Sequence, residues 1–255
     1  MFDAHVESSA EAENNKELAK HPSASFLQDV FSEVPDTYER VNHVLTLGLD
    51  ILWRRRNARI AAQGGGTEWV DVCTGTGETA VYLKKLAPEG TRVRGVDFTP
   101  EMMAEARKKP AATGIEFIMA DIGDLPFEDN SVDLFTMSFA TRNVNINREL
   151  LIRGFAELYR VLKPGGRYVT VETSQPRNAL VRKMFHLYIR LIVKQLGSRI
   201  SGSLAGYAYL SRTIPKFYGA VELAEIMKEA GFDDVGFRRM MFGASAIHIA
   251  RKKEA

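Results

Sequence analysis

Two kinds of apolar spacing alternate along the middle of the chain, one typical of buried strands and one typical of helices. Short apolar runs that end in a turn or an acidic residue predict strands at 69–72, 92–97, 115–119, 132–137 and 167–172. Helical spacing and helix-ending signals predict helices at 79–86, 100–109 and 150–162. Strands that alternate with helices in this way predict a doubly wound α/β fold around a mostly parallel sheet.

The C-terminal part has a different pattern. A helix is predicted over 221–230, stopped by Gly231, and two strands are predicted at 235–241 and 244–250, on either side of Phe242-Gly243. These two strands should form an antiparallel hairpin at the edge of the sheet. The complete prediction is therefore a seven-stranded, Rossmann-like sheet with five parallel strands, a C-terminal antiparallel hairpin and a helical cap.

The N-terminal part should supply that cap. Residues 1–23 lack periodic apolar positions and are predicted to be a flexible tail. From Phe26 to Trp53 apolar residues recur at helical spacing, broken by Pro35 and Gly48, which predicts two or three short helices. The three arginines at 54–56 are interpreted as the solvated face of a helix that runs to about residue 62; contact with an anion or a lipid head group is the alternative.

A second appended segment follows the parallel strands. Residues 180–192 carry apolar side chains at helical spacing, with basic side chains on another face. A basic amphipathic helix can lie on an anionic membrane, cover an apolar substrate, or simply pack against the core, and the pattern leaves all three open. The predicted units are a tail (1–23), a helical cap (24–62), a nucleotide-binding core (63–176), a lid (177–217) and a closing helix with hairpin (218–255).

Composition narrows the class of protein. The chain has 34 basic and 32 acidic residues, a balance that gives no reason to expect a nucleic-acid partner. Its single cysteine, Cys73, excludes an internal disulfide and a cysteine-based zinc cluster, and no metal site is predicted. Residues 1–20 lack the apolar centre of a signal peptide, and no apolar run is long enough to span a bilayer, so a cytoplasmic location is predicted.

The stretch between the first strand and the first core helix carries the strongest chemical signal. Gly75 and Gly77 predict a tight turn that lets a ligand approach the backbone, next to a helix start with unpaired N–H groups. Gly75-x-Gly77-x-x-Ala80, with Asp97 about 20 residues later, also satisfies the dinucleotide pattern. Asp71 favours S-adenosylmethionine over NAD, because a carboxylate there could bind the ammonium group that only the methyl donor carries.

Three aspartates should meet on one rim of the sheet. Asp71, Asp97 and Asp121 each lie at or just past the end of one of the first three predicted strands. Because parallel strands end on the same side, and ligands of such sheets bind at their carboxyl ends, these residues predict a ligand rim.

Nearly the whole chain from Phe26 onward resembles the ubiquinone/menaquinone biosynthesis C-methyltransferases, which are class I S-adenosylmethionine-dependent enzymes. The stretch from Phe139 to Val144, with its Arg-Asn-Val, is the closest to a family signature, whereas Leu-Pro-Phe and Leu-Lys-Pro-Gly-Gly occur in many class I methyltransferases. The matching stretches are 30–34 with Tyr38 and Asn42, 71–77, 95–99, 120–121, 125–127, 138–139, 142–144, 160–166, and Tyr207-x-Tyr209-Leu210.

The resemblance implies methylation of a ring carbon of a prenylated quinol, such as demethylmenaquinol. It implies contact with the inner face of the membrane and, by family habit, a homodimer. Arg142 and Asn143 are interpreted as stabilising the acceptor's oxyanion, while the base stays open between Tyr38, Glu39 and His186. The cofactor positions that the motifs and the resemblance give are Asp71, Gly75, Thr76, Gly77, Asp97, Phe98, Asp121, Ile122 and Ser138.

Departures from the family pattern keep other functions open. They lie at Glu39, Glu78, Lys194 and 211–215, mostly outside the cofactor turn, and so bear on the acceptor more than on methyl transfer. The alternatives are a methyltransferase of another small apolar or phenolic acceptor, an NAD-dependent oxidoreductase, and a non-catalytic S-adenosylmethionine-binding protein.

Overall fold

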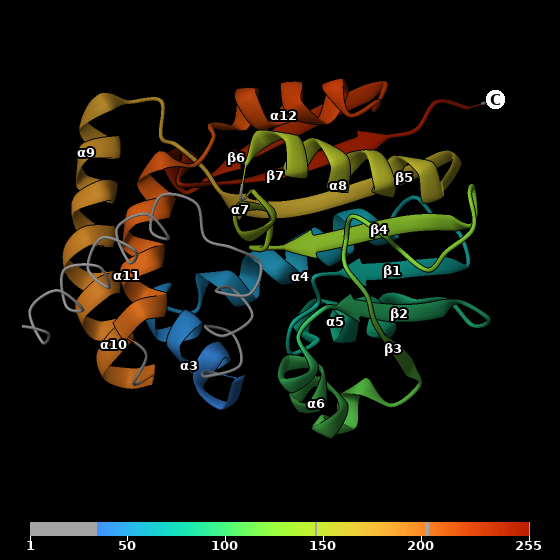
Figure 1. The fold of residues 1–255 in the computed structure, drawn as a ribbon, viewed down its shortest axis with the longest axis horizontal. Coiled ribbons are helices and arrows are strands. Elements are labelled where there is room, and N and C mark those ends of the chain that lie inside the picture. Colours follow the sequence, from blue (N-terminus) through green and yellow to red (C-terminus); the bar gives the residue numbers. More distant parts are fainter. Residues whose placement is uncertain (1–34, 146, 202–203, 255) are drawn as a thin grey trace, which may run out of the picture.

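A seven-stranded sheet organises the computed structural model, which describes residues 35–145, 147–201 and 204–254 (Figure 1). The strand order is β3-β2-β1-β4-β5-β7-β6. The strands are β1 (Glu68–Val72), β2 (Arg92–Asp97), β3 (Ile115–Met119), β4 (Val132–Ser138), β5 (Leu162–Thr173), β6 (Asp234–Met240) and β7 (Ser245–Arg251). The predicted fold class is confirmed, including the number of strands.

The last strand distinguishes this sheet from a dinucleotide-binding one. The first five strands pair in parallel, whereas β7 lies between β5 and β6 and runs antiparallel to both. A dinucleotide-binding sheet has the order 3-2-1-4-5-6 with all strands parallel. The C-terminal hairpin that the sequence predicts is therefore present, and its second strand is inserted into the sheet.

Helices cover both faces of the sheet and bury its apolar side chains. On one face lie α4 (Leu49–Ala62) and α5 (Glu78–Leu86), which pack on Trp69, Leu134 and Val169. On the other face lie α8 (Arg148–Val161) and α12 (Ala220–Glu229), which pack on Phe135 and Tyr168 among others. Strands buried on both faces explain the continuous apolar runs in the sequence.

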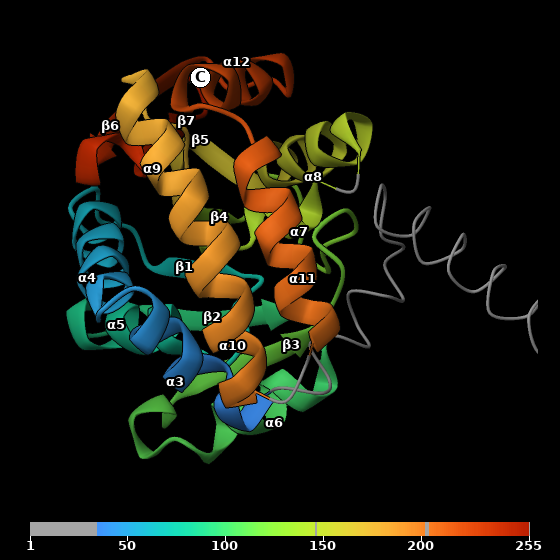
Figure 2. The ribbon, with the colours of Figure 1, turned by 90° about the vertical axis from the view of Figure 1, so that its left-hand side faces the viewer.

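A layer of lid helices lies beyond the carboxyl ends of the parallel strands, at the left of Figure 1 and facing the viewer in Figure 2. Apolar residues of α3, η2 and η3 form a small core of their own. Gly48, at a φ of 76°, makes the predicted break between α3 and α4. The lid elements are α3 (Pro35–Leu45), α9 (Ala179–Tyr188), the π-helical turn η2 (Ile189–Val193), α10 (Lys194–Ser201), α11 (Leu204–Thr213) and η3 (Ile214–Lys216).

Shorter elements connect these layers. They are α6 (Pro100–Lys108), η1 (Pro110–Ala112), α7 (Thr141–Val144) and η4 (Met241–Gly243). Pro100 occupies the first turn of α6 as predicted, although the Thr99 side chain makes no capping hydrogen bond. The tail predicted for 1–23 and the apolar positions from Phe26 to Val34 lie outside the described residues.

The start of β5 differs from the prediction. The sequence 163–166 is predicted only to end the helix over 150–162, with a strand from Arg167, but β5 begins at Leu162. Leu162 pairs with Val132. Lys252 N donates a hydrogen bond of 3.0 Å to Gly166 O, and Gly165 N donates one of 3.1 Å to Lys252 O. Pairing with the neighbouring strands therefore overrides the local turn preference of Pro-Gly-Gly.

Candidate active site

The turn between β1 and α5 has the left-handed backbone that the two glycines allow. Gly75 has a φ of 56° and Gly77 a φ of 78°, both in the left-handed region. A Cβ atom on Gly77 would lie 3.1 Å from Ala106 and 3.3 Å from Phe117, so this glycine also allows close packing behind the turn. Cys73 adopts a φ of 50°, and burial raises the pKa of its thiol well above the ordinary value, which favours a structural role.

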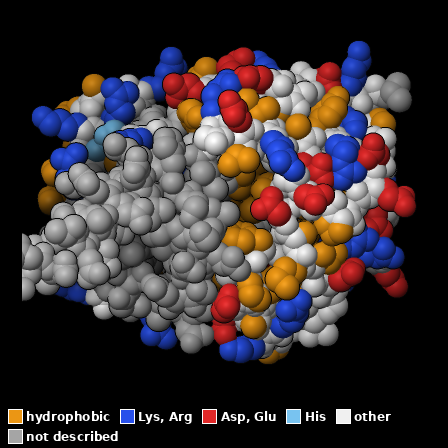
Figure 3. Space-filling view, viewed as in Figure 1, with side chains coloured by type: hydrophobic (Ala, Val, Ile, Leu, Met, Phe, Trp, Pro, Cys, Tyr) orange, Lys and Arg blue, Asp and Glu red, His pale blue; other side chains and the backbone are white. Residues whose placement is uncertain are grey.

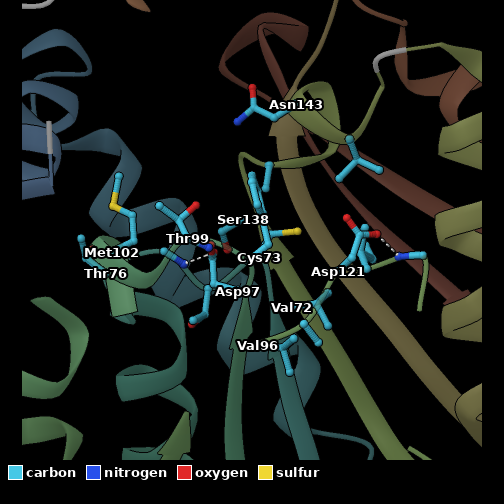
Figure 4. Close-up of a pocket in the computed structure, with 18 of the residues that line it drawn as sticks. Val72, Cys73, Thr76, Val96, Asp97, Thr99, Met102, Asp121, Ser138 and Asn143 are labelled. Atoms are coloured by element: carbon cyan, nitrogen blue, oxygen red, sulfur yellow. Dashed lines mark hydrogen bonds between the residues drawn. The ribbon is translucent and has the colours of Figure 1, made fainter. Parts of the chain in front are cut away.

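A cavity of about 410 Å³ lies against this turn, at the carboxyl ends of the first four strands (Figure 4). Acidic and hydroxyl side chains from different strand ends border it, together with apolar side chains such as Val72, Val96 and Met102. Among the predicted cofactor residues, those that line it are Gly75, Thr76, Asp97, Phe98, Asp121, Ile122 and Ser138. We call this space the cofactor cavity.

Asp97 ties the glycine turn to the end of β2. Its Oδ2 accepts a hydrogen bond of 2.8 Å from Gly75 N, and its Oδ1 accepts one of 2.9 Å from Thr99 N. Burial raises the pKa of this carboxyl, and the backbone donors partly offset that effect. Each oxygen keeps a second lone pair, so Asp97 could also accept hydrogen bonds from two neighbouring hydroxyls of a ligand.

Two further side chains border the cofactor cavity with their orientation fixed. Asp121, just past β3, accepts a hydrogen bond of 2.7 Å from Gly123 N through Oδ1. Ser138, at the end of β4, accepts one of 2.9 Å from Thr79 Oγ1 on α5. In Figure 4 Asp121 and Asp97 approach from different sides, so the cavity presents hydrogen-bond acceptors to both ends of a nucleoside-sized ligand.

Asp71 and Gly77 lie behind the turn and do not line the cofactor cavity. The Asp71 carboxylate is 1% exposed and accepts hydrogen bonds of 2.6 Å from the hydroxyls of Thr74 and Thr136. In the structure it therefore holds the turn in place. Desolvation raises the pKa of Asp71 from 3.8 to about 6, and the two hydroxyl donors only partly offset this effect.

This raised pKa predicts a pH-dependent stability. Between pH 4 and 6 the folded chain binds more protons at Asp71 than the unfolded chain does, so the free energy of unfolding should fall as the pH rises. The shift corresponds to roughly 3 kcal/mol of stabilisation, which is present below the unfolded pKa and fully lost above the folded pKa. Urea unfolding of the wild type and of Asp71→Asn at pH 4 and pH 7 checks this; equal pH dependence of the two would contradict it.

A second cavity, of about 560 Å³, lies between the strand ends and the lid helices. Its walls are mostly apolar and aromatic. The apolar lining comes from α3, α4 and the turn between them (Leu45, Leu47, Leu49, Trp53), the residue after β4 (Phe139), α9 and η2 (Val181, Met184, Phe185, Tyr188, Ile189, Val193), α11 and η3 (Tyr209, Leu210, Ile214) and η4 (Met241, Phe242). Arg54 and Asn143 line both cavities, so the second one, the acceptor cavity, adjoins the first.

Arg142 brings a buried cation to the acceptor cavity. Its side chain is 7% exposed, and its Nε and Nη1 atoms lack a hydrogen-bond partner in the described structure. Its backbone N donates to Oε2 of Glu172 over 3.2 Å. Asn143 follows on α7, and its Oδ1 is likewise buried without a partner. Such unsatisfied groups beside a cavity are positioned for a polar ligand atom.

Arg54 corrects one expectation from the sequence. The interpretation of 54–56 as a solvated face is wrong for Arg54, which is 6% exposed, lies 3.4 Å from Oε2 of Glu78 and stacks 5.2 Å above the Phe139 ring. The spacing to Ala58 and Ala61, both fully buried, places it on the inward face of α4. That i, i+4, i+7 relation was the signal available in the sequence.

The three residues considered as a base are not grouped around the acceptor cavity. Glu39 accepts from Thr76 Oγ1 and pairs with Lys109, on the cofactor side. His186 Nε2 lies 2.8 Å from Gln175 Oε1 and does not line the cavity. The side chain of Tyr38 lies outside the described residues. Two polar residues that sequence reasoning missed, Asp50 and Glu172, do line it.

Comparison with known proteins assigns the chain to a family. A model of the ubiE/COQ5 methyltransferase family matches residues 17–252, which is most of the chain. The chain belongs to the ubiE/COQ5 methyltransferase family. The resemblance seen in the sequence motifs is thereby confirmed, and the chain is a methyltransferase.

Curated relatives in the ubiE/COQ5 family match over nearly their full length. The ubiquinone/menaquinone biosynthesis C-methyltransferase UbiE of Desulfotalea psychrophila is 36% identical over 231 residues, 91% of each chain. The demethylmenaquinone methyltransferase of Thermus thermophilus is 38% identical over 222 residues, 86% of this chain and 98% of that protein. The enzyme of the same name from Chlorobaculum tepidum is 35% identical over 248 residues, 96% of this chain and 99% of that protein.

Solved structures support the fold of the ubiE/COQ5 chain. A SAM-dependent methyltransferase from Thermotoga maritima superposes with a TM-score of 0.63 at 19% identity, covering 88% of this chain and 99% of that one. One from Aquifex aeolicus gives a TM-score of 0.51 at 20% identity, covering 76% and 88%. At these identities the likeness concerns the fold, which is the predicted class I methyltransferase sheet.

Proposed function

We propose that the chain is an S-adenosylmethionine-dependent C-methyltransferase that methylates a ring carbon of a prenylated quinol such as demethylmenaquinol. The observation that carries this proposal is the adjoining pair of cavities, one bordered by Asp97, Asp121 and the glycine turn and the other almost wholly apolar, with Arg54 and Asn143 in both walls. The names of the full-length relatives support the same acceptor class.

The residues of the cofactor cavity fit the proposed donor. Asp97, with a free lone pair on each oxygen, would bind the two ribose hydroxyls, and Asp121 would accept from the adenine amino group. The turn at Gly75 and Thr76 leaves room for the methionine part, since a Cβ atom on Gly75 would meet nothing within 4 Å. Asp71, which lies behind the turn, would act by holding Thr74 in place.

When bound, S-adenosylmethionine supplies a methyl group that its sulfonium has already activated. The remaining task of the chain is to place the acceptor carbon in line with that methyl group and to make it nucleophilic. A ring carbon becomes nucleophilic when the neighbouring hydroxyl is ionised. The buried Arg142 guanidinium, whose Nε and Nη1 atoms are unpartnered in the described structure, would stabilise the resulting oxyanion, and the Nδ2 amino group of Asn143 would donate a further hydrogen bond to it.

The acceptor cavity favours an apolar substrate over the rival functions. Its lining is mostly aliphatic and aromatic, and the antiparallel strand β7 counts against an NAD-dependent oxidoreductase. A methyltransferase of another small phenolic acceptor would use the same cofactor residues and differ in what fills this cavity. A non-catalytic binding protein would have no use for a buried arginine whose Nε and Nη1 atoms find no partner among the described residues.

Transfer of a labelled methyl group tests the proposal. Purified chain, labelled methyl donor and reduced demethylmenaquinone should yield labelled menaquinol, and S-adenosylhomocysteine should bind in a calorimetric titration in which NADH gives no heat. Labelling of a soluble phenol but not of the quinol would favour the first rival. Binding of NADH instead of S-adenosylhomocysteine would contradict methyl transfer altogether.

A prenylated acceptor implies access from a membrane, and the lid is built for such a contact. Residues 177–217 contain eight Lys and Arg and no Asp or Glu. Exposed apolar side chains on the outer face of α9 and η2, and at the cavity rim, are Leu47, Leu180, Met184, Leu187, Leu191 and Phe242. In Figure 3 Lys and Arg side chains gather at the upper left, over α9, and apolar side chains surround a separate hollow near the centre of that face. No helix in the described ranges could cross a bilayer.

We expect the protein to sediment with anionic liposomes and to be released by salt, because basic residues gain free energy near an anionic surface. Arg182→Glu with Lys183→Glu, both exposed on α9, should weaken binding at least 30-fold, since each basic residue removed costs about 1 kcal/mol. The matched control is Arg251→Glu with Lys253→Glu, at the opposite end of the sheet. Equal weakening by both pairs would contradict a specific role for the lid.

A further inference from the structure

The acceptor cavity needs a group that takes up the proton of the acceptor's hydroxyl. The described lining holds six ionisable side chains: Asp50, Arg54, Arg142, Glu172, Tyr188 and Tyr209. The arginines stay protonated at any working pH, and burial raises the pKa of both tyrosines above its ordinary value. The two carboxylates, which carry free lone pairs, are therefore the candidate proton acceptors in this lining.

Glu172 is poorly placed for this task because its carboxylate is enclosed. The residue is fully buried, its Oε1 accepts hydrogen bonds from the backbone N and the hydroxyl of Thr173, and its Oε2 accepts from the backbone N of Arg142. None of these partners titrates, so a proton delivered to Glu172 has no onward acceptor among them. Its carboxylate instead holds the backbone of Arg142 at the start of α7.

Asp50 is connected to the outside. Its Oδ1 accepts a hydrogen bond of 2.6 Å from Thr46 Oγ1, and its Oδ2 lies 2.8 Å from Nδ1 of His43. The Asp50 side chain is 2% exposed, whereas that of His43 is 30% exposed. Each carboxylate oxygen keeps a second lone pair toward its surroundings. The pair therefore spans the wall from the cavity lining to the solvent side of α3.

Charged groups on the neighbouring helices surround His43. On the side of the ring away from Asp50, Nε2 lies 3.7 Å from Oε1 of Glu78 on α5. Glu78 also faces Arg54 on α4, and Glu39 on α3 pairs with Lys109 beyond α6. The ring therefore lies between the Asp50 and Glu78 carboxylates, and its two nitrogens allow a proton to enter at Nδ1 and another to leave at Nε2.

On the basis of the proposed function, we propose that Asp50 takes the proton of the acceptor hydroxyl and that His43 passes it to solvent. The acceptor's O–H bond breaks, the proton goes to the Asp50–His43 pair, and the electron pair stays on oxygen and is delocalised to the ring carbon. That carbon forms the new bond to the methyl group as the methyl–sulfur bond breaks, with the sulfur keeping its electron pair. The carbon then loses its hydrogen as a proton and oxygen regains one, so one proton is released in all.

The pH profile of methyl transfer tests this proposal with His43→Gln, a change at a partly exposed side chain. We expect kcat to fall roughly 100-fold, in the range of general acid–base catalysis, with the affinity for S-adenosylhomocysteine unchanged. In the wild type kcat should fall at acidic pH, and in His43→Gln this fall should be absent. Added imidazole should restore part of the activity of His43→Ala. Asp50→Asn should show at least as large a loss in kcat.

The matched control is His186→Gln, which removes another lid histidine with a 2.8 Å hydrogen bond but no place in the cavity lining. It should retain the activity and pH profile of the wild type. A wild-type kcat and pH profile in His43→Gln would overturn the proposal. So would a loss matched by an equal loss of thermal stability and of S-adenosylhomocysteine binding, because the pair would then only join α3 to α4.

A failure of the proposed function would look different. In that case the wild type would label no quinol, although it binds S-adenosylhomocysteine. The pair can still be judged by following the ring nitrogens of His43 by NMR in the wild type and in Asp50→Asn. Titration of His43 that is the same in both proteins would overturn the coupling on which the proposal rests.

Discussion

Replacing Arg142 with alanine should lower kcat by about 100- to 1,000-fold while the affinity for S-adenosylhomocysteine stays within twofold. The first effect is the cost of removing a preorganised donor from a developing oxyanion. The second follows because Arg142 lines the acceptor cavity and not the cofactor cavity. Single-turnover methyl transfer and calorimetric titration measure the two quantities separately.

Two further variants make the Arg142 result specific. Arg142→Lys keeps the charge but loses the planar fork of donors, so its kcat should lie between those of the wild type and Arg142→Ala. Arg148→Ala removes a surface arginine paired with Glu229 and should behave like the wild type. If Arg142→Ala lost cofactor affinity and catalysis in equal measure, Arg142 would hold the strand ends rather than the oxyanion.

Replacing Asp97 with asparagine should weaken S-adenosylhomocysteine binding by about 100-fold. Hydrogen bonds to a charged group contribute roughly 1.5–3 kcal/mol each, and the amide can keep only part of them. Asparagine also replaces one of the two acceptors that hold Gly75 N and Thr99 N. Calorimetric titration measures the affinity, and kcat at saturating donor should change much less.

Asp133→Asn is the matched control for Asp97. Asp133 also accepts from two backbone N–H groups, Thr67 N and Glu68 N, but it does so at the opposite end of the strands. The control should bind S-adenosylhomocysteine like the wild type even if it is less stable. Unchanged binding in Asp97→Asn would contradict its ribose role, and equal weakening in the two variants would mean that sheet geometry alone sets the affinity.

The sequence predicts the parallel core well because its signals are local. Apolar runs, helix caps and glycines define β1 to β4 and the helices between them, and the structure agrees to within a few residues. The start of β5 and the position of β7 inside the sheet depend on pairing between segments far apart in the chain, such as Arg167 with Arg251. Such pairing has no local sequence signal.

The residues of the candidate site also differ in whether local sequence signals predict them. The cofactor residues sit at strand ends or in the glycine turn, where the topology of a parallel sheet places them without side-chain detail. The inward position of Arg54, the burial of Asp71 behind the turn and the pairing of Asp50 with His43 depend on how α3 and α4 pack against the sheet. The acceptor cavity was therefore harder to predict than the cofactor cavity.

The wall shared by the two cavities also has a consequence for inhibitor design. Arg54 and Asn143 border both spaces, so a single molecule with a nucleoside at one end and an apolar ring at the other could fill them together. Tethering makes the second contact intramolecular, so such a compound gains affinity beyond that of either half. Its apolar half would meet walls built from the lid, which should set it apart from methyltransferases that share only the nucleotide half.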